Sequence, residues 1–466
     1  MTNRVSVIGL GKLGATMAAC FAERGFEVIG VDINPHSIEA VNEGRAPVQE
    51  TGLDALIAAN KDRIKATASH VEAVLGSDIS FVIVPTPSDE RGAFSLQYAA
   101  WAFKEIGRAI AKKDTYHNVV LTSTVLPGGT REALLPILER ESGKKAGRDF
   151  GLCYSPEFIA LGSIIKNFLN PDFTLIGELD DKCGSQLEEL YSRVVENGAP
   201  SARMSLENAE LAKISVNAFV TTKITFANML AEICEQLPGG NIDVVSNALG
   251  LDTRIGRKYL TGGLGYGGPC FPRDNFALNF FAKELGVTAG LSSMTDTMNR
   301  SVAAKVVERL RPMIRDNVTV AVLGLAYKPF SHVTEESQAL FIAQALSKAG
   351  ARVVAFDPLA SEMPQSELNG GFVVIDSLSD CLRQAQIVII ATPDPVFAAL
   401  TADDFKNEFA TVTVVDFWRL LQSELSEKPN IKYLAFGLGI DDDAKAKRLR
   451  NLWVGPETER LTTTAK

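Results

Sequence analysis

Short apolar runs alternate with helical patterns along the first third of the chain. A helical pattern of apolar positions covers residues 15–23 and ends before Gly25. The apolar runs around it lie at Val5–Ile8, Val28–Val31, Ile79–Val84 and Val119–Thr122. Strands that alternate with helices in this way predict a mostly parallel sheet with helices on both faces.

A similar order recurs near the C-terminus. Val318–Leu323 is apolar, a helical pattern covers Ser337–Lys348, and the apolar run Arg352–Phe356 ends before Asp357. Between the two halves a helical pattern runs from Leu206 to about Gln236, far beyond the length of an average helix. The sequence therefore predicts an α/β protein with two Rossmann-like doubly wound domains joined by a long central helix.

Composition narrows the class of protein. The chain has 466 residues, a formal charge of −9, six cysteines and four histidines. An acidic chain is unlike a nucleic-acid binder, and its apolar runs are too short for a membrane span. The first residues enter a strand pattern directly, without a signal peptide. Scattered Cys and His predict neither a disulfide framework nor a metal site, so we expect a reduced, cytoplasmic enzyme.

A glycine pattern joins the first predicted strand to its helix. In such a motif the first glycine permits a tight turn, the second lets a pyrophosphate approach the backbone, and the third lets helix and strand pack closely. Here these glycines are Gly9, Gly11 and Gly14, and Asp32 stands where an acidic residue binds the adenosine ribose. The context predicts NAD rather than NADP, the alternative being a glycine-rich turn that binds nothing.

One cysteine stands in a glycine-rich segment, residues 262–274. The glycines predict a backbone that wraps closely around a ligand with its N–H groups exposed. Cys270 follows them, and the nearby Arg273 favours the thiolate, which is the nucleophilic form. Cys270 is therefore the candidate nucleophile, the alternative being a small packing residue. The other five cysteines are interpreted as packing residues.

The segment 265–274 reads Gly-Tyr-Gly-Gly-Pro-Cys-Phe-Pro-Arg-Asp and resembles the GYGGSCFPKD run of the UDP-glucose/GDP-mannose dehydrogenase family, in particular its UDP-glucose branch. The resemblance extends over nearly the whole chain. It also includes residues 48–53, 86–87, 123–128, 155–158, 210–213 with Asn217, and 324–329.

The resemblance implies an NAD-dependent, four-electron oxidation of a nucleotide sugar to a uronate, UDP-glucose to UDP-glucuronate for surface polysaccharide being the expected case. A cysteine suits the second oxidation, because an aldehyde releases no hydride until a nucleophile has added to it. The same chemistry on a UDP-N-acetylhexosamine or GDP-mannose stays open, and so does a catalytically silent nucleotide-sugar sensor. A homodimer or higher homo-oligomer is implied as well.

The resemblance also assigns site residues. The catalytic set is Cys270 as nucleophile, Lys213 and Asn217 as oxyanion stabilisers, Asp274 and Thr124 as residues that position water, and Glu157 as an aid to hydrolysis. The cofactor set is Gly9, Gly11, Gly14, Asp32, Thr86, Thr124 and Arg273. The substrate set is Glu157, Lys213, Asn217, Tyr259, Gly265, Gly267, Tyr327, Lys328, Arg419 and, from a neighbouring subunit, Arg254.

Some positions depart from the family pattern. Leu161, Phe173, Glu335, Ser95 and Pro85 stand where the family usually has an acidic residue, two arginines, an aspartate and a glycine, respectively. They leave the identity of the sugar and the nucleotide open. We expect an NAD-binding domain at 1–203, a central helical and dimerisation segment with the cysteine loop at 204–302, a nucleotide-sugar-binding domain at 303–455 and a polar tail at 456–466.

Overall fold

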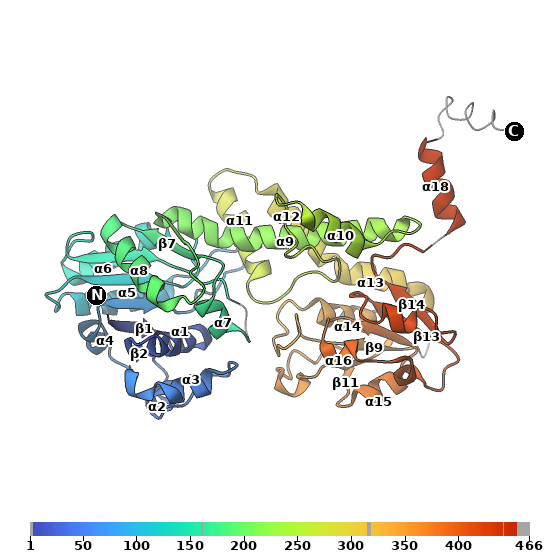
Figure 1. The fold of residues 1–466 in the computed structure, drawn as a ribbon, viewed down its shortest axis with the longest axis horizontal. Helices are drawn as coiled ribbons and strands as arrows, with labels where there is room; N and C mark the ends of the chain where they lie inside the picture. The colour runs from blue at the N-terminus through green and yellow to red at the C-terminus, as the bar shows by residue number, and fades with distance from the viewer. Residues whose placement is uncertain (1–2, 160–161, 315–317, 441, 454–466) are drawn as a thin grey trace. The chain divides into compact units, whose positions relative to one another are not determined.

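The computed structural model describes residues 3–159, 162–314, 318–440 and 442–453. The chain divides into two compact units (Figure 1). Unit 1 consists of Met1–Val216 and Phe276–Thr288, and unit 2 of Asn217–Asn275 and Ala289–Lys466. Helices α9 (Leu206–Gln236) and α11 (Phe271–Glu284) contribute residues to both units.

Unit 1 holds a sheet whose strand order is β3-β2-β1-β4-β5-β6-β7-β8. Neighbouring strands are parallel except for β6 and β7, which pair antiparallel. The strands are β1 (Arg4–Ile8), β2 (Glu27–Val31), β3 (Ile64–Thr67), β4 (Ile79–Val82), β5 (His117–Leu121), β6 (Phe150–Tyr154), β7 (Thr174–Glu178) and β8 (Ser201–Ser205).

Helices cover both faces of this sheet, which explains why its inner strands β4 and β5 are buried throughout rather than alternating. Phe21 and Phe168 pack on one face, and Phe103 and Leu138 pack on the other. The helices are α1 (Lys12–Glu23), α2 (Pro35–Asn42), α3 (Leu53–Ala59), α4 (His70–Gly76), α5 (Gln97–Ile110), α6 (Leu135–Ser142), α7 (Ile164–Leu169) and α8 (Asp181–Val194).

Unit 2 holds a parallel sheet of order β11-β10-β9-β12-β13-β14. Its strands are β9 (Thr319–Leu323), β10 (Arg352–Phe356), β11 (Val373–Val374), β12 (Ile387–Ile390), β13 (Val412–Asp416) and β14 (Ile431–Ala435). Its helices are α10 (Ile242–Leu251), α12 (Gly290–Arg300), α13 (Val302–Leu310), α14 (Gln338–Lys348), α15 (Leu378–Arg383), α16 (Pro395–Ala398), α17 (Gln422–Leu425) and α18 (Asp443–Trp453).

Helices again pack on both faces of the second sheet. Leu310 and Ile342 belong to the core on one face, and Leu382 and Phe397 belong to the core on the other. The predicted fold class is therefore confirmed: two doubly wound sheets and a long central helix, whose bounds match the predicted ones. The first helix begins earlier than predicted, at Lys12, so that Gly14 lies in its first turn.

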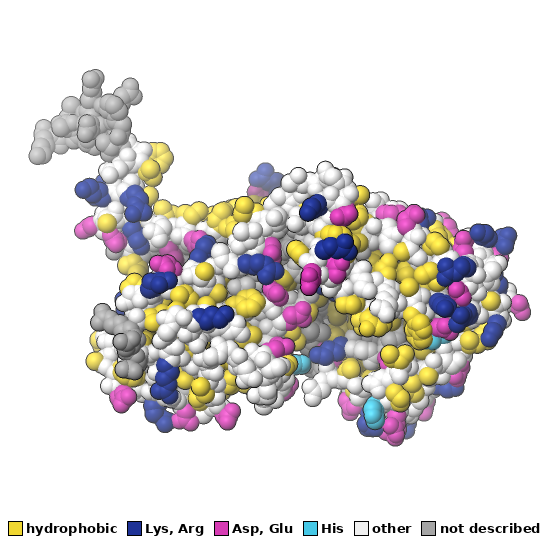
Figure 2. Space-filling model, turned by 180° about the vertical axis from the view of Figure 1, so that it is seen from behind, with side chains coloured by type: hydrophobic (Ala, Val, Ile, Leu, Met, Phe, Trp, Pro, Cys, Tyr) yellow, Lys and Arg dark blue, Asp and Glu magenta, His cyan; other side chains and the backbone are white. Residues whose placement is uncertain are grey.

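Two further observations concern the expected class of protein. None of the described helices is both long and apolar enough to cross a membrane. On the face of the molecule in Figure 2, acidic and basic side chains are interspersed over the surface. The expected domain boundaries stay predictions, and the tail expected at 456–466 lies outside the described residues, as does Leu161.

Candidate active site

The glycines after β1 have separate roles. Gly9 has φ +101°, and a Cβ there would lie 2.1 Å from the Ile83 backbone oxygen. A Cβ on Gly14 would lie 1.9 Å from the Gly9 oxygen. At Gly11, by contrast, the described residues leave the space within 4 Å of a Cβ empty. Gly9 and Gly14 are therefore required by the fold, whereas Gly11 keeps a space open at the N-terminus of α1, where backbone N–H groups favour a phosphate.

Asp32, at the end of β2, orders the same turn. Its carboxylate accepts hydrogen bonds from the backbone N–H of Leu10 at 2.7 Å and of Asn34 at 2.8 Å. The open cradle at Gly11 and this carboxylate fit a dinucleotide that lies across the carboxyl ends of the strands. The contact of Asp32 with a ribose stays a prediction.

The loops after β4 and β5 are joined beside this turn. Thr86 Oγ1 donates to the backbone oxygen of Thr124 at 2.7 Å. Ser123 Oγ donates to the Val84 oxygen at 2.7 Å and accepts from the Val84 N–H at 2.9 Å. Strand order reverses between β1 and β4, which is where open α/β sheets bind their ligands. The structure thus brings Thr86 and Thr124 together at the predicted edge.

Lys213 of α9 is anchored beside Glu157. Its ammonium donates to the Glu157 backbone oxygen at 2.5 Å and lies 4.3 Å from the centre of the Phe158 ring. Burial raises the pKa of the Glu157 carboxyl to about 8, against the opposing charge of Lys213. Phe173 packs against Phe158 with the ring centres 5.1 Å apart and the rings tilted by 39°, so the departure at 173 fills apolar space.

Two carboxylates without a predicted role fix nearby loops. Glu210 accepts from the backbone N–H of Gly128 at 2.6 Å and of Thr130 at 2.8 Å. Glu50 accepts from the N–H of Gly162 and Ile164, both at 3.0 Å. Helical spacing was a usable signal for Glu210, which lies three residues before Lys213 and so shares its helix face.

In unit 2, Cys270 lies just before α11 and is exposed, whereas the other five cysteines are buried, as their interpretation as packing residues predicts. One turn into the helix, Asp274 is 1% exposed, and its N–H donates to the Cys270 oxygen at 2.8 Å. Asn217 Nδ2 donates to the Asp274 carboxylate at 2.6 Å. Cys270, Asp274 and Asn217 are thus brought together. Since Lys213 precedes Asn217 by four residues, both share one face of α9.

The glycine segment before Cys270 corrects one expectation. Two of its N–H groups bind protein atoms instead of lying free for a ligand: Tyr266 N–H donates to Asn299 and Gly268 N–H to the Glu335 oxygen, both at 2.9 Å. A Cβ on Gly265 would lie 2.0 Å from Asn299 Oδ1, and one on Gly267 2.4 Å from a backbone oxygen. The glycines are needed because protein atoms fill the space around them. Substrate contacts of Gly265 and Gly267 stay predictions.

Tyr327 and Lys328 follow β9. The ring of Tyr327 lies against Gly268, and burial raises the pKa of its hydroxyl to about 12. Lys328 lines a cavity of about 140 Å³ with Asp357 and Thr392. Asp357 has the same structural role as Asp32, because its carboxylate accepts hydrogen bonds from two backbone N–H groups of the turn after β9.

Arg419, for which the sequence predicts a substrate contact, is held by other residues of the protein. Its side chain is 3% exposed and binds protein atoms through every nitrogen. The acceptors are the carboxylate of Asp243 and the backbone oxygens of Gly262, Phe417 and Phe436. It therefore ties the start of the cysteine loop to β13 and β14, and its sugar contact stays a prediction.

Three predicted residues remain: Arg254, Tyr259 and Arg273. Arg254 has an 86% exposed side chain paired with Asp252, as a residue that serves a neighbouring subunit requires. Tyr259 is half-exposed and has φ +66°. Arg273 lies 3.6 Å from Asp274 in unit 2, and its contact with a cofactor stays a prediction. The described residues include no cluster of three His, Cys, Asp or Glu that could hold a metal ion.

Comparisons with known proteins agree with this arrangement. Residues 3–195 match the NAD binding domain, 207–301 the central domain and 321–423 the UDP binding domain of the UDP-glucose/GDP-mannose dehydrogenase family. A UDP-glucose 6-dehydrogenase of Haloferax volcanii is 36% identical over 421 residues, 90% of this chain and 97% of that one. A GDP-mannose 6-dehydrogenase of Azotobacter vinelandii is 34% identical over 416 residues, 86% and 94% of the two chains.

A solved structure agrees over a similar length. The UDP-glucose dehydrogenase from Pyrobaculum islandicum superposes with a TM-score of 0.83 at 33% identity and covers 94% of this chain and 98% of its own. The predicted family and cofactor are therefore confirmed. The chain belongs to the UDP-glucose/GDP-mannose dehydrogenase family and is an NAD-dependent nucleotide-sugar dehydrogenase.

Proposed function

We propose that this enzyme oxidises UDP-glucose to UDP-glucuronate in two steps, with Cys270 as the covalent nucleophile. The observation that carries the proposal is the exposed Cys270 one helical turn before the buried Asp274, which accepts a hydrogen bond from Asn217. A packing cysteine would be buried, as the other five are. The same observation disfavours a silent nucleotide-sugar sensor, because binding alone needs no exposed thiol beside a polar pair.

In the first oxidation the primary alcohol becomes an aldehyde and releases a proton and a hydride. When bound, NAD accepts the hydride that each oxidation releases. Lys213 and Asn217 donate hydrogen bonds to the oxygen on which negative charge develops. The short contact between Lys213 and the Glu157 backbone holds the ammonium in place before the reaction.

In the second oxidation the Cys270 sulfur forms a bond to the aldehyde carbon and gives a thiohemiacetal. The oxyanion of this adduct is stabilised by the same two donors, Lys213 and Asn217. Loss of hydride from the carbon converts the adduct into a thioester without breaking the carbon–sulfur bond.

Hydrolysis completes the cycle. Water adds to the thioester carbonyl, the carbon–sulfur bond breaks, and the Cys270 thiolate leaves as the carboxylate product forms. Glu157 accepts the proton of the attacking water, and Asp274 and Thr124 position water. The pKa of Glu157, raised by burial to about 8, makes this carboxyl a base whose protonated and ionised forms are both accessible near neutral pH.

The choice of UDP-glucose is supported by relatives of that activity in Haloferax volcanii and Rhizobium meliloti and by the superposed structure. A panel of UDP-glucose, UDP-N-acetylhexosamines and GDP-mannose, compared by kcat/KM at saturating NAD, tests it. We expect UDP-glucose to exceed every other sugar at least tenfold. A higher value for GDP-mannose would reassign the substrate and leave the chemistry intact.

We also propose a homodimer. On the part of α9 in unit 2, the exposed side chains Phe219, Phe226 and Ile233 recur every seven residues and so form one apolar stripe. A second copy of this helix would cover the stripe, and Arg254 would then serve the partner's site. Sedimentation of the wild type and of Phe226→Glu tests this: the dimer is expected to dissociate in the variant, and an unchanged sedimentation coefficient would contradict it.

A further inference from the structure

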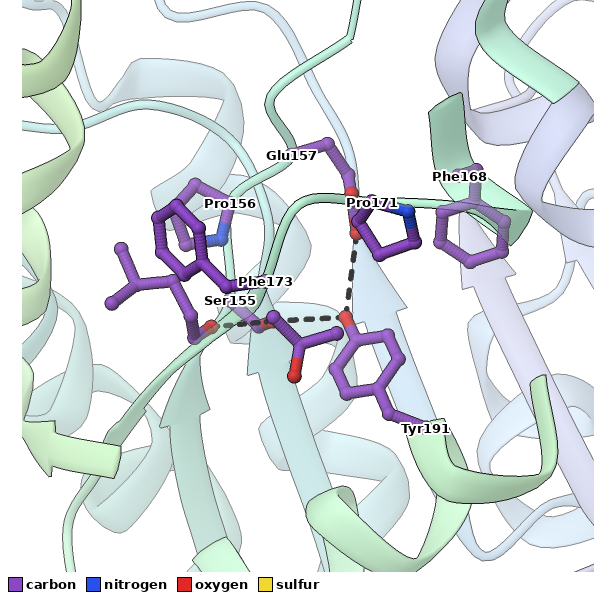
Figure 3. Close-up of a pocket in the computed structure, with 9 residues that line it drawn as sticks. Ser155, Pro156, Glu157, Phe168, Pro171, Phe173 and Tyr191 are labelled. Atoms are coloured by element: carbon purple, nitrogen blue, oxygen red, sulfur yellow. Dashed lines mark hydrogen bonds between the residues drawn. The ribbon is translucent and has the colours of Figure 1, made fainter. Parts of the chain in front are cut away.

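Three polar groups form a line behind Glu157 (Figure 3). The Tyr191 hydroxyl of α8 lies 2.8 Å from Ser155 Oγ and 3.4 Å from Glu157 Oε1. Ser155 Oγ, just after β6, donates in turn to the backbone oxygen of Leu175 in β7 at 2.9 Å. Tyr191 is 3% exposed and Ser155 is 1% exposed, so both hydroxyls must find their partners inside the protein.

The line contains three hydrogen-bond contacts but only two hydroxyl protons. Each hydroxyl has one proton to donate, and the Ser155 proton points to Leu175. The short contact between Tyr191 and Ser155 then requires that Tyr191 donates to Ser155. In its contact with Glu157 Tyr191 is again the donor, so Ser155 Oγ at 2.8 Å and the Glu157 carboxylate at 3.4 Å compete for its one proton.

The ionisation of Glu157 decides this competition. The carboxylate accepts only, so Tyr191 has to turn its proton towards Glu157. Ser155 must then either donate to Tyr191 and release Leu175, or face the Tyr191 oxygen without a proton between them. Ionising Glu157 thus costs Ser155 its donor, whereas a protonated Glu157 leaves the Tyr191 proton to Ser155.

The line lies outside reach of a substrate. The cavity beside it, lined by Ser155, Glu157, Phe168 and Tyr191, has a volume of about 10 Å³, which is at the lower limit for one water molecule. Ser155 and Tyr191 therefore act through Glu157. Burial raises the pKa of Tyr191 well above its ordinary value, so this hydroxyl keeps its proton while Glu157 titrates.

The charged and titratable groups around Glu157 come from three helices. Lys213 of α9 holds the Glu157 backbone and favours the carboxylate by its charge. Tyr191 of α8 contacts the carboxyl itself. Cys20 of α1 is buried, and burial together with the charge of Glu157 raises the pKa of its thiol to about 12, so it stays neutral. Lys213 and Tyr191 thus both favour the carboxylate form of Glu157, whereas burial favours its protonated form.

We propose that Tyr191 and Ser155 are positioning residues that form a hydroxyl relay, in which Ser155 and the Glu157 carboxylate compete for the one Tyr191 proton, so that Tyr191 favours the ionised form of Glu157 and Ser155 the protonated form. The proposal rests on the proposed role of Glu157 in thioester hydrolysis. It adds that the relay sets the pH at which Glu157 becomes a base, and therefore the pH at which hydrolysis becomes fast.

The two hydroxyls have opposite effects on the titration of Glu157. In Ser155→Ala, Tyr191 can donate only to Glu157. A hydrogen bond to a charged acceptor is the stronger kind, so the ionised form of Glu157 is stabilised and its pKa falls. In Tyr191→Phe the Glu157 carboxylate loses its hydroxyl donor. Burial then has the larger influence on its pKa, and the protonated form of Glu157 is stabilised. We expect the midpoint to fall by about one pH unit in the first variant and to rise by a similar amount in the second.

Infrared difference spectra of the carboxyl stretch across pH, with the band of Glu157 assigned by its loss in Glu157→Gln, measure this titration on the enzyme without substrate. The pH dependence of thioester hydrolysis after a single turnover is measured beside it. Tyr116→Phe and Ser37→Ala, which remove buried hydroxyls from other elements of unit 1, are the matched controls. Ser155→Gly replaces Ser155→Ala if the latter does not fold.

Opposite shifts of the infrared midpoint in the two variants, with none in the controls, support the relay. Shifts in the same direction, or no shift, overturn it, because a merely structural role does not separate the two hydroxyls. If the infrared midpoints move in opposite directions but the pH profile of hydrolysis does not follow them, the relay stands and the role of Glu157 in hydrolysis fails.

Discussion

The first turns of the two sheets share a framework and differ in what they offer a ligand. Each has a glycine with positive φ, Gly9 at +101° and Gly324 at +93°. Each is fastened by an aspartate that accepts backbone N–H groups, Asp32 after β2 and Asp357 after β10. An aspartate at this place is therefore a structural part of the turn, whether or not it also binds a ribose.

The difference lies in the residues after the glycine. In unit 1, α1 begins at Lys12, and Gly11 leaves open space beside its N-terminus. In unit 2, α14 begins only at Gln338, and the longer loop before it presents Tyr327 and Lys328. The first turn offers a phosphate a helix N-terminus, whereas the second offers side chains. The longer loop in unit 2 thus lets a similar turn present side chains, instead of a helix N-terminus, to a ligand.

The largest expected effect distinguishes Gly9 from Gly324, because an added methyl group would meet different atoms at the two positions. We expect Gly9→Ala to destabilise unit 1 by about 3 kcal/mol or more, because its Cβ would collide with backbone that cannot move away. Gly324→Ala meets the side chain of Thr392 rather than backbone atoms and is expected to cost less. Denaturant unfolding measures both, and equal losses would contradict this ranking.

Arg419→Lys is expected to cost unit 2 about 2 kcal/mol, since a lysine cannot replace the fork of hydrogen bonds to Asp243 and Gly262. The expected loss is small because solvent screens the partly exposed Asp243 carboxylate. The matched control is Arg254→Lys at an exposed position, expected to leave stability unchanged and to raise KM. If Arg419→Lys raised KM at unchanged stability, Arg419 would be a substrate residue.

Asp32→Asn and Asp357→Asn test whether each aspartate stabilises its turn by accepting backbone N–H groups. Each removes a charged acceptor from a turn, for which we expect a loss of about 1.5 kcal/mol in the unfolding of its own unit. Only Asp32→Asn is expected also to weaken NAD binding, measured by titration calorimetry. Equal NAD affinity in both variants would show that Asp32 is structural alone.

Gly11→Ala isolates the ligand side of the first turn. The methyl group enters open space, so we expect the free energy of unfolding to change by no more than about 0.5 kcal/mol. The dissociation constant of NAD should rise at least tenfold, because the methyl group occupies the approach to the α1 N-terminus. Unchanged affinity at unchanged stability would place the pyrophosphate elsewhere.

The last expected effect is a pH dependence. Burial raises the pKa of Glu157 to about 8, so between about pH 4.5 and 8 the folded enzyme holds a proton that the unfolded chain has released. Glu157 therefore makes stability fall as pH rises through that window. Glu157→Gln should flatten the decline, measured by chemical unfolding at several pH values. An equally steep decline in the variant would assign it to other groups.

The sequence could predict what depends on local patterns. Strands buried on both faces must be apolar throughout, so β1, β2, β9 and β10 lie close to their predicted places, and α9 matches its predicted bounds. Cys270 was found by its unusual neighbours, and its exposure distinguishes it from the buried cysteines.

Contacts between distant segments could not be predicted. Tyr191 meets Glu157 only because α8 packs against the sheet near β6, and no periodicity in the sequence records that meeting. The glycines before Cys270 show a related limit. Glycine indicates that something approaches the backbone closely, but not whether ligand or protein fills the space, and here it is Asn299, Glu336 and Tyr327.

The central claim is a four-electron oxidation through Cys270. Its most direct test counts NADH formed per UDP-glucose consumed, at limiting sugar and saturating NAD, in the wild type and in Cys270→Ala. We expect two NADH per sugar in the wild type, and at most one, with turnover almost abolished, in the variant. One NADH per sugar in the wild type, or unchanged turnover in Cys270→Ala, would contradict the account.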